Sequence, residues 1–319
     1  MKISFSIIIT CFNKGTYIEE TLNSVLTQNY SDYEILVIDD FSNDDSVKKI
    51  SVIAENYATV KLVINNENKG ANFSRNRGLD NCKYNYVIFL DGDDLLHENC
   101  LLNRSRVIKE NLLNDLWIFS LNSFYEKKEK VHTVWTPPDC DLLNRFLSHR
   151  LPWSISQPVW RKDFLSSLGG FDVTFIRLQD VELHTRALFK GARVFVSKNP
   201  PDCYYRISNA RILNFERYFE NQIQGGLMYF KKFYRQNFEN KMIFGTLLML
   251  IDSVWEGKTS GKITIIYAKK LIDDLLTSVL LVSHDKKRVK QLHLYWNIKS
   301  RFNFNLKGLR YFFTKLIIR

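Results

Sequence analysis

An apolar run at residues 86–90 ends directly in the sequence Asp-Gly-Asp-Asp at residues 91–94. The run has the length and composition of a buried strand, and parallel α/β sheets bind their ligands at the carboxyl ends of strands. Carboxylates crowded at such a point are unfavourable unless positive charge neutralises them. A hard divalent cation that carries nucleotide phosphates would do so, because Mg²⁺ and Mn²⁺ prefer oxygen ligands. The alternative, which these four residues alone leave open, is an acidic turn that only ends a strand or binds Ca²⁺ loosely.

The spacing within this acidic block favours a shared ligand. Asp91 and Asp93 are two residues apart, so in extended backbone their side chains project to the same side. Gly92 between them would let the backbone approach a bulky diphosphate closely. We expect Asp93 to be the principal metal ligand, with Asp91 contacting a ribose or reaching the metal through water. A bound Mn²⁺ or Mg²⁺ would offset the charge that grows on a diphosphate leaving group.

The first hundred residues alternate between strand and helix. Apolar, β-rich runs lie at 5–10, 34–38, 60–64 and 86–90. We expect the intervening helices to begin at a capping box opened by Thr16, at an N-cap Ser42, and at Gly70. Alternation at this short spacing predicts a parallel sheet with right-handed crossovers.

The rest of the chain divides into a mixed part and a helical part. Further strands are predicted at 116–121, 130–135, 155–160, 193–196 and 203–206, and helices at 141–147 and 180–189. From about residue 213 the pattern is helical, with breaks near Asn237, at 258–261 and near His284. We therefore predict an α/β domain at 1–210, with a Rossmann-like, mostly parallel sheet flanked by helices. An all-helical, basic region at 211–319 follows it.

Composition excludes several classes of protein. The chain has 319 residues, enough for one large domain and an extension, and its 45% hydrophobic content is ordinary for a globular protein. Its five cysteines are scattered without a Cys-x-x-Cys pair, which argues against structural zinc and a disulfide framework. A strand follows directly after Met1 and Lys2, so we expect no signal peptide, and no apolar run is long enough to cross a bilayer. These features favour a cytoplasmic location.

The positive charge is concentrated in the last residues. Residues 284–319 hold ten Lys and Arg and one acid, a net +9 of the chain's +11. Aromatic residues interleave with these charges, at Trp296, Phe302, Phe304, Phe312 and Phe313 among others. An amphipathic segment of this kind can bind the inner, anionic face of a membrane, and the alternative is a packed helix with a solvated basic face. Nucleic acid is a less favoured partner, because the first 283 residues are nearly neutral and carry no nucleic-acid motif.

Five ordered blocks carry a resemblance to a known family. They are 6–13 (Ser-Ile-Ile-Ile-Thr-Cys-Phe-Asn), 34–42 around Asp39-Asp40, 70–78 with Ser74-Arg75-Asn76, 91–94, and 168–172 (Leu-Gly-Gly-Phe-Asp) followed by 179–183 (Gln-Asp-Val-Glu-Leu). Together they resemble glycosyltransferase family 2, the inverting transferases of GT-A fold, over the first two-thirds of the chain. The resemblance implies a nucleotide-sugar half at 1–97 and an acceptor half at 98–210. It also implies a UDP-sugar as the usual donor, and transfer of a hexosyl or N-acetylhexosaminyl group to a glycan or lipid-linked hydroxyl, as in polysaccharide biosynthesis.

The donor pocket is expected at the ends of the first two strands. Thr10 and Phe12 end the first strand, and Asp40 ends the second. A carboxylate can accept the N–H of uracil, and an aromatic ring can lie against the base. The alternatives are core packing for Phe12 and a charge pair at a helix start for Asp39 and Asp40.

Four further residues complete the predicted donor site. Asn13 belongs to the first block, and Asp39 is expected to point to the opposite side of its strand from Asp40. Arg75 could reach the uracil or a phosphate, the alternative being a surface arginine. Arg206 could likewise reach the diphosphate or remain solvated.

An inverting transfer needs one base, which takes the proton of the acceptor hydroxyl. Asp180 stands at the position of the family's catalytic Asp, although an N-cap role would by itself explain an aspartate there. In the family the residue that precedes the catalytic Asp is usually acidic. Here that residue is Gln179, so a negative charge beside the base is absent. His184 lies one turn further and, with Gln179 and Trp153, is a candidate acceptor contact. A surface histidine and a buried core tryptophan are the alternatives.

Two other activities were weighed. A dinucleotide oxidoreductase is disfavoured, since no Gly-x-Gly-x-x-Gly follows the first strand. A homologue that binds a sugar nucleotide without turnover is disfavoured because Asp93 and Asp180 are both retained.

Overall fold

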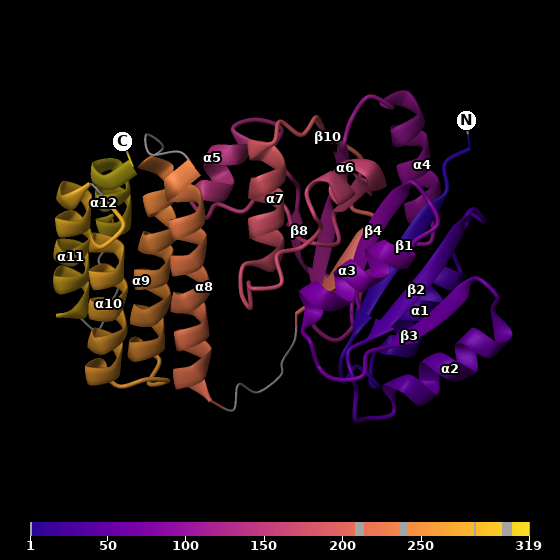
Figure 1. The fold of residues 1–319 in the computed structure, drawn as a ribbon, viewed down its shortest axis with the longest axis horizontal. Helices are drawn as coiled ribbons and strands as arrows, with labels where there is room; N and C mark the ends of the chain where they lie inside the picture. The colour runs from indigo at the N-terminus through magenta and orange to yellow at the C-terminus, as the bar shows by residue number, and fades with distance from the viewer. Residues whose placement is uncertain (1, 208–213, 237–240, 284, 302–307, 319) are drawn as a thin grey trace. The chain divides into compact units, whose positions relative to one another are not determined.

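The computed structural model describes residues 2–207, 214–236, 241–283, 285–301 and 308–318. Two compact units make up the chain (Figure 1). The first comprises 1–140, 152–174 and 186–209, and the second comprises 141–151, 175–185 and 210–319. Two short internal segments, 141–151 and 175–185, thus group with the helical unit.

The first unit is built on a seven-stranded sheet with the order β10-β6-β9-β4-β1-β2-β3. Its strands are β1 (Phe5–Cys11), β2 (Tyr33–Asp39), β3 (Val60–Ile64), β4 (Tyr86–Asp91), β6 (Leu116–Ile118), β9 (Pro158–Arg161) and β10 (Val194–Val196). The first four strands are parallel, as predicted, whereas β9 runs antiparallel between β4 and β6. The α/β class and the mostly parallel sheet are thus confirmed.

The register of these strands brings the predicted site residues to one edge. Thr10 of β1 pairs with Asp91 of β4, and Cys11 pairs with Asp39 of β2. The three strands therefore end at the same level. The loops that follow them meet there, which is where a parallel sheet binds its ligands.

Three helices connect the parallel strands: α1 (Ile18–Leu26), α2 (Ser46–Asn56) and α3 (Ala71–Asn81). Gly70 precedes α3 with φ of 84°, which glycine adopts readily. The other two predicted helix starts are wrong. The N-cap of α1 is Tyr17, with no side-chain cap and no role for Thr16. Ser42 lies four residues before α2, because its hydroxyl and N–H instead donate to Asp39, at 2.5 and 2.9 Å.

A second sheet of four strands belongs to the same unit, in the order β5-β11-β7-β8. It comprises β5 (Leu95–Leu96), β7 (Leu121–Phe124), β8 (Val131–Trp135) and β11 (Cys203–Arg206), and the unit also contains α4 (Cys100–Glu110) and α6 (Lys162–Ser167). The single strand predicted at 116–121 is thus split, since β6 pairs in the large sheet and β7 in the small one. Arg104 of α4 makes a fully buried ion pair with Asp202, at 2.7 Å, and so fixes the segment before β11.

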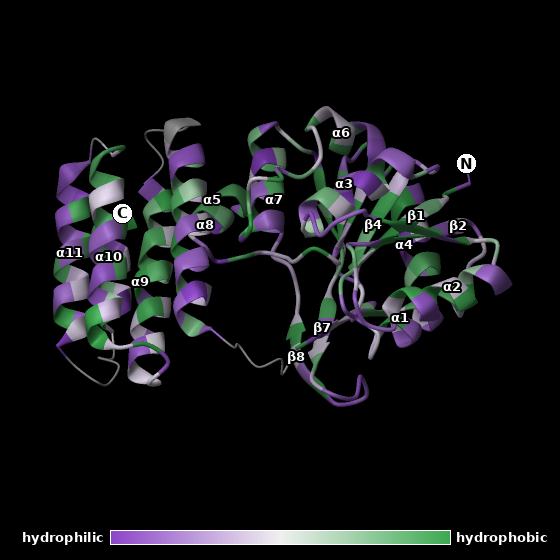
Figure 2. Cartoon of the chain, turned by 60° about the horizontal axis from the view of Figure 1, so that its bottom comes forward, coloured by the Kyte–Doolittle hydropathy of each residue, from purple (hydrophilic) through white to green (hydrophobic). Residues whose placement is uncertain are grey.

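The second unit is helical, as predicted for the C-terminal region. It includes α5 (Leu142–Leu147), most of α7 (Gln179–Phe189), α8 (Phe215–Gln236), a 3₁₀ turn (Lys241–Ile243), α9 (Phe244–Thr259), α10 (Ile265–Leu280), α11 (Lys286–Ser300) and α12 (Leu309–Ile318). Helices α8 to α12 lie side by side (Figure 1). Figure 2 shows α9 largely hydrophobic and α11 largely hydrophilic, in keeping with the burial of most of α9. The predicted breaks at Asn237 and His284 lie outside the described residues.

The aromatic residues of the basic segment do not share one environment. Trp296 and Phe313 are buried in the helical unit, whereas Phe312 is exposed. Phe302 and Phe304 lie outside the described residues. Among the helices that the structure describes, none combines the length and apolar composition that a membrane crossing requires.

Candidate functional site

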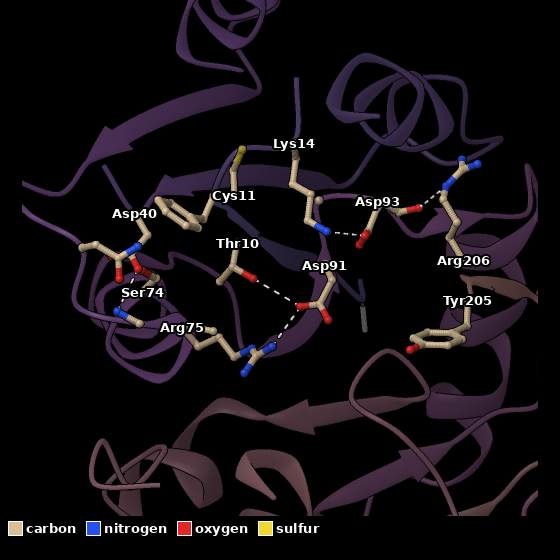
Figure 3. A pocket seen from close by; sticks show the side chains of 15 residues that line it. Thr10, Cys11, Lys14, Asp40, Ser74, Arg75, Asp91, Asp93, Tyr205 and Arg206 are labelled. Carbon is tan, nitrogen blue, oxygen red and sulfur yellow. Dashed lines mark hydrogen bonds and ion pairs between the residues drawn. The ribbon is translucent and has the colours of Figure 1, made fainter. Parts of the chain in front are cut away.

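A cavity of about 610 Å³ opens at the carboxyl ends of β1 and β4 (Figure 3). Eight of the predicted site residues line it: Thr10, Phe12, Asp40, Arg75, Asp91, Gly92, Asp93 and Arg206. The cavity also exposes side chains that sequence reasoning missed, among them Lys14, Ser74 and Tyr205. Its volume is in the range of ordinary ligand sites.

Asp91 is held in the cavity by two neighbours. Its carboxylate accepts hydrogen bonds from the Thr10 hydroxyl at 3.2 Å and from Arg75 Nη2 at 2.9 Å. Arg75 is buried, with its guanidinium 5.3 Å from the centre of the Phe171 ring. The surface-arginine alternative is therefore wrong, and Arg75 is a fixed cation beside the acidic block.

Asp93 is paired with a second cation. The Nζ atom of Lys14 makes an ion pair with the Asp93 carboxylate inside the cavity (Figure 3). Burial lowers the pKa of Lys14, but the nearby Asp93, with Asp91 and Asp94, outweighs it and raises that pKa overall. Lys14 follows β1 in a loop without a motif, so only its nearness to the strand end could have pointed to it.

Gly92 is also required by packing, and its predicted approach to a diphosphate stays a prediction. A Cβ added there would lie 2.9 Å from the Thr10 carbonyl oxygen and 3.4 Å from Lys14 Cγ. The Gly92 N–H also donates to that Thr10 oxygen, at 3.0 Å. Glycine is needed here because β1 passes so close, and the same contact ties the acidic turn to the end of β1.

Asp94 and Arg206 connect the acidic turn to the end of β11. Asp94 is almost fully buried and accepts the Arg206 N–H at 2.9 Å. Burial, and then the charges of Asp91 and Asp93, raise the pKa of Asp94 well above its ordinary value.

The guanidinium of Arg206 is engaged within the protein. It donates from Nε to the Asp93 carbonyl at 2.9 Å, pairs with Glu20, and lies over the rings of Tyr17 and Phe124. Arg206 is buried, so the solvated alternative is wrong, and it positions the backbone of the acidic turn. It also lines the donor cavity, and its reach toward a diphosphate stays a prediction.

Asp40 closes the other end of the cavity. Its Oδ1 accepts from Asn65 Nδ2 at 2.7 Å and from the Lys69 N–H at 2.9 Å, and its Oδ2 accepts from the Gly70 N–H at 2.7 Å. Phe12 has 45% of its surface exposed, which excludes the core-packing alternative.

Two predicted donor residues do not line the cavity. Asp39 is fully buried and accepts two hydrogen bonds from Ser42. The side-chain oxygen of Asn13 accepts the backbone N–H of Asn43 at 2.9 Å. The backbone N–H of Asn13 donates to the Ser42 hydroxyl at 2.9 Å. Both residues shape the loop between β2 and α2, and their roles as direct ligands stay predictions.

The predicted acceptor contacts are less favoured. Trp153 is fully buried, so the core alternative holds in place of sugar stacking. His184 is also fully buried, with its ring 5.4 Å from that of Phe146, and burial lowers its pKa to about 3. It is therefore neither a surface histidine nor placed to touch an acceptor.

Asp180 and Gln179 form the first turn of α7 in the second unit, after Leu178 with φ of 57°. Both are partly buried. A carboxylate in the first turn of a helix is stabilised by the helix dipole. Their roles as base and acceptor contact stay predictions.

The acidic block fits a cation that arrives with its ligand. Within the described part of the chain, no group of three or more His, Cys, Asp or Glu side chains could hold a metal. Asp91 and Asp93 nevertheless supply two carboxylates to one cavity, and Mg²⁺ is commonly held by one or two carboxylates together with substrate phosphates. Lys14 would have to leave Asp93 for such a cation to bind there.

A parallel sheet with a cavity of this charge at its carboxyl edge is typical of α/β proteins that bind phosphorylated ligands. Residues 6–155 match the sequence model of the family described as glycosyl transferase family 2. The predicted resemblance to this family is thus confirmed for residues 6–155.

Comparisons with individual proteins agree with this assignment. The chain is 41% identical over 109 residues to the poly(ribitol-phosphate) beta-N-acetylglucosaminyltransferase TarP of Staphylococcus aureus, a match that covers 33% of each chain. It is 34% identical over 97 residues to the GalNAc(5)-diNAcBac-PP-undecaprenol beta-1,3-glucosyltransferase of Campylobacter jejuni, covering 30% of this chain and 31% of that protein. The matches thus span about a third of either relative.

A solved structure shows the likeness of fold. S. aureus TarS 1–349 in complex with UDP-GlcNAc superposes with a TM-score of 0.67, over 98% of this chain and 92% of that one, at 19% identity. The fold is therefore GT-A.

Proposed function

We propose that this chain is an inverting glycosyltransferase that moves a sugar from a nucleotide sugar, most plausibly a UDP-sugar, to a hydroxyl of a glycan or lipid-linked acceptor. The observation that carries the proposal is the pairing of Asp91 and Asp93 with Arg75 and Lys14 in one cavity of about 610 Å³. Two carboxylates and two cations at a strand edge can receive both a metal ion and the diphosphate that it carries.

The opposite end of the cavity suits the nucleobase of the donor. Asp40 Oδ2 accepts one hydrogen bond from the described residues, so it retains capacity for the N–H of a uracil. The exposed Phe12 ring offers an apolar surface for the same base. UDP-GlcNAc is the first donor to test, because TarS binds it and the name of TarP specifies N-acetylglucosaminyl transfer.

The acidic block would hold the metal. Asp93, with Asp91 directly or through water, would bind Mn²⁺ or Mg²⁺. Bound there, such a cation would offset the charge that develops on the leaving diphosphate. Lys14, released from Asp93, and Arg75 would then face the diphosphate oxygens as donors.

The acceptor side rests on Asp180. An inverting transfer needs one carboxylate that accepts the proton of the attacking hydroxyl, and Asp180 occupies the catalytic position of the fifth sequence block. Its place in the first turn of α7, where the helix dipole stabilises a carboxylate, supports this role. The acceptor is a glycan or a lipid-linked sugar, in line with the names of TarP and of the Campylobacter enzyme.

Thermal stabilisation by a panel of nucleotide sugars, with and without Mn²⁺, tests this function. We expect UDP-sugars to raise the melting temperature more than GDP- or dTDP-sugars do, and Mn²⁺ to enlarge the effect. Slow release of UDP from the preferred donor would then demonstrate turnover. Binding without any release of UDP, even with acceptor extracts, would leave a sugar-nucleotide-binding protein and contradict the enzyme assignment.

A further inference from the structure

A second cavity, of about 510 Å³, lies within the helical unit, between the segment after α5 and the helices α9 and α12. Three basic side chains line it: Arg150, Arg310 and Lys315. The hydroxyl-bearing residues Ser148 and Thr314 line it as well. None of the residues that line it also lines the donor cavity.

The positive charge in this cavity is incompletely balanced. Asp141 is the acid that lines it, and it approaches Arg150 only to 3.8 Å. Arg310 pairs with the buried Asp252, but the same carboxylate also pairs with Lys299, so one acid serves two cations.

Lys315 adds a third cation. Its ammonium lies 4.4 Å from the centre of the Tyr311 ring and makes no ion pair with the residues that the structure describes. A cavity that gathers three cations around hydroxyl groups can bind an anion with several acceptor oxygens, and arginine matches a phosphate well.

Exposed apolar side chains beside the cavity identify the source of that phosphate. On α12, Tyr311 and Phe312 have 64% and 59% of their surface exposed, and Leu316 is also exposed. Tyr311 lines the cavity itself, while the apolar Met242 and Leu248 form part of its wall. A soluble phosphate would gain nothing from these groups, whereas a bilayer accepts aromatic and leucine side chains at its headgroup level.

The neighbouring charge has the same sign. Lys286, Lys287 and Lys290 on α11 are exposed, and residues 284–319 carry a net +9. Anionic lipids attract such a segment, and each basic residue near the surface raises binding about fivefold. Charge and exposed apolar area therefore favour one occupant.

We propose that the cavity between Arg150, Arg310 and Lys315 binds the phosphate of an anionic phospholipid, with Tyr311, Phe312 and Leu316 of α12 entering the headgroup region of the bilayer. The helical unit would then hold the chain at a membrane surface.

The test is co-sedimentation of the full chain with sucrose-loaded vesicles, either of phosphatidylcholine alone or with added phosphatidylglycerol. We expect binding to the anionic vesicles that falls as salt rises. The double variant Arg150→Gln with Lys315→Gln should lower it by more than the ~25-fold that general attraction accounts for at two basic residues, and Phe312→Ser with Leu316→Ser should also weaken it. Arg310 is left in place, because its removal would change the charge around buried Asp252.

A matched control separates the cavity from general attraction. Lys287→Gln with Lys290→Gln removes the same charge from exposed positions outside the cavity and should cost clearly less binding. Equal losses in the two double variants would overturn the cavity as a phosphate site. Melting temperatures of all variants establish that they are folded.

Two further arms address the source of the phosphate. Inorganic phosphate should stabilise the protein little, and duplex DNA should not compete with the vesicles. Strong stabilisation by inorganic phosphate without vesicle binding would make the ligand a soluble phosphate compound. DNA binding that is lost in the cavity variant would indicate a nucleic-acid site. Either result contradicts the lipid proposal.

Discussion

The ammonium of Lys14 pairs with the carboxylate of Asp93, the residue proposed as the principal metal ligand. The pair lies in the donor cavity, with the Lys14 side chain about a third exposed. Without a nucleotide, Lys14 therefore supplies the positive charge that the acidic block requires. A metal–diphosphate complex would bring its own cation and also offer Lys14 a new anionic partner.

Lys14→Met should destabilise the ligand-free protein, because three neighbouring carboxylates lose a compensating charge. The expected cost is about 1–3 kcal/mol, below the loss for a fully buried pair. Mn²⁺ alone should restore more of the melting temperature in the variant than in the wild type, since the cation no longer competes with Lys14. Lys61→Met, which removes the pairing of an exposed lysine with Glu34, is the control. An identical response to Mn²⁺ in variant and wild type would contradict this role for Lys14.

Asp180→Asn should leave donor binding intact and lower kcat by about 10²–10⁴-fold, the usual loss when a general base is removed. Donor affinity by calorimetry and kcat by UDP release are the two readouts. Unchanged kcat, or normal chemistry with lost donor binding, would place the base elsewhere.

Buried His184 should make the protein less stable in mild acid. Burial lowers its folded-state pKa from 6.5 to about 3, so the unfolded chain takes up the proton first. The contribution of neutral His184 to the free energy of unfolding is present above pH 6.5 and is lost as the pH falls toward 3. Between pH 7 and pH 5 the loss is about 2 kcal/mol.

Substitution separates this contribution from other acid effects. In His184→Asn, the free energy of unfolding measured in urea should fall by about 2 kcal/mol less between pH 7 and pH 5 than in the wild type. The exposed His132→Asn should leave it unchanged. Equal slopes for His184→Asn and wild type would show that His184 is not the titrating group.

The parallel core could be predicted because its signals are local. The strands β1 to β4 are continuous apolar runs, and Asp40, Asp91 and Asp93 mark the ends of β2 and β4. A parallel register then brings those ends together without any further information. The residues of the donor cavity that follow directly from strand ends were identified for this reason.

The errors come from contacts that leave no pattern in the sequence, most of them between distant residues. Ser42 resembles an N-cap, but the buried Asp39 accepts its hydroxyl, so the helix starts later. The strand at 116–121 is divided because its two halves join different sheets. Lys14 and Arg206 carry no motif, and their partners lie 79 and 186 residues away, at Asp93 and Glu20. Such pairings depend on the folded arrangement and leave no periodic signal.

Calorimetric titration of UDP into wild-type protein and Asp93→Asn, each with and without Mn²⁺, tests the central claim most directly. We expect Mn²⁺ to strengthen UDP binding to the wild type and to the control Asp139→Asn, whose carboxylate is exposed and pairs with Lys198. In Asp93→Asn, UDP should bind weakly and equally with and without Mn²⁺, while the melting temperature remains that of a folded protein. If Asp93→Asn kept the full enhancement by Mn²⁺, together with wild-type turnover, the metal and diphosphate would bind elsewhere and the account of this cavity would be wrong.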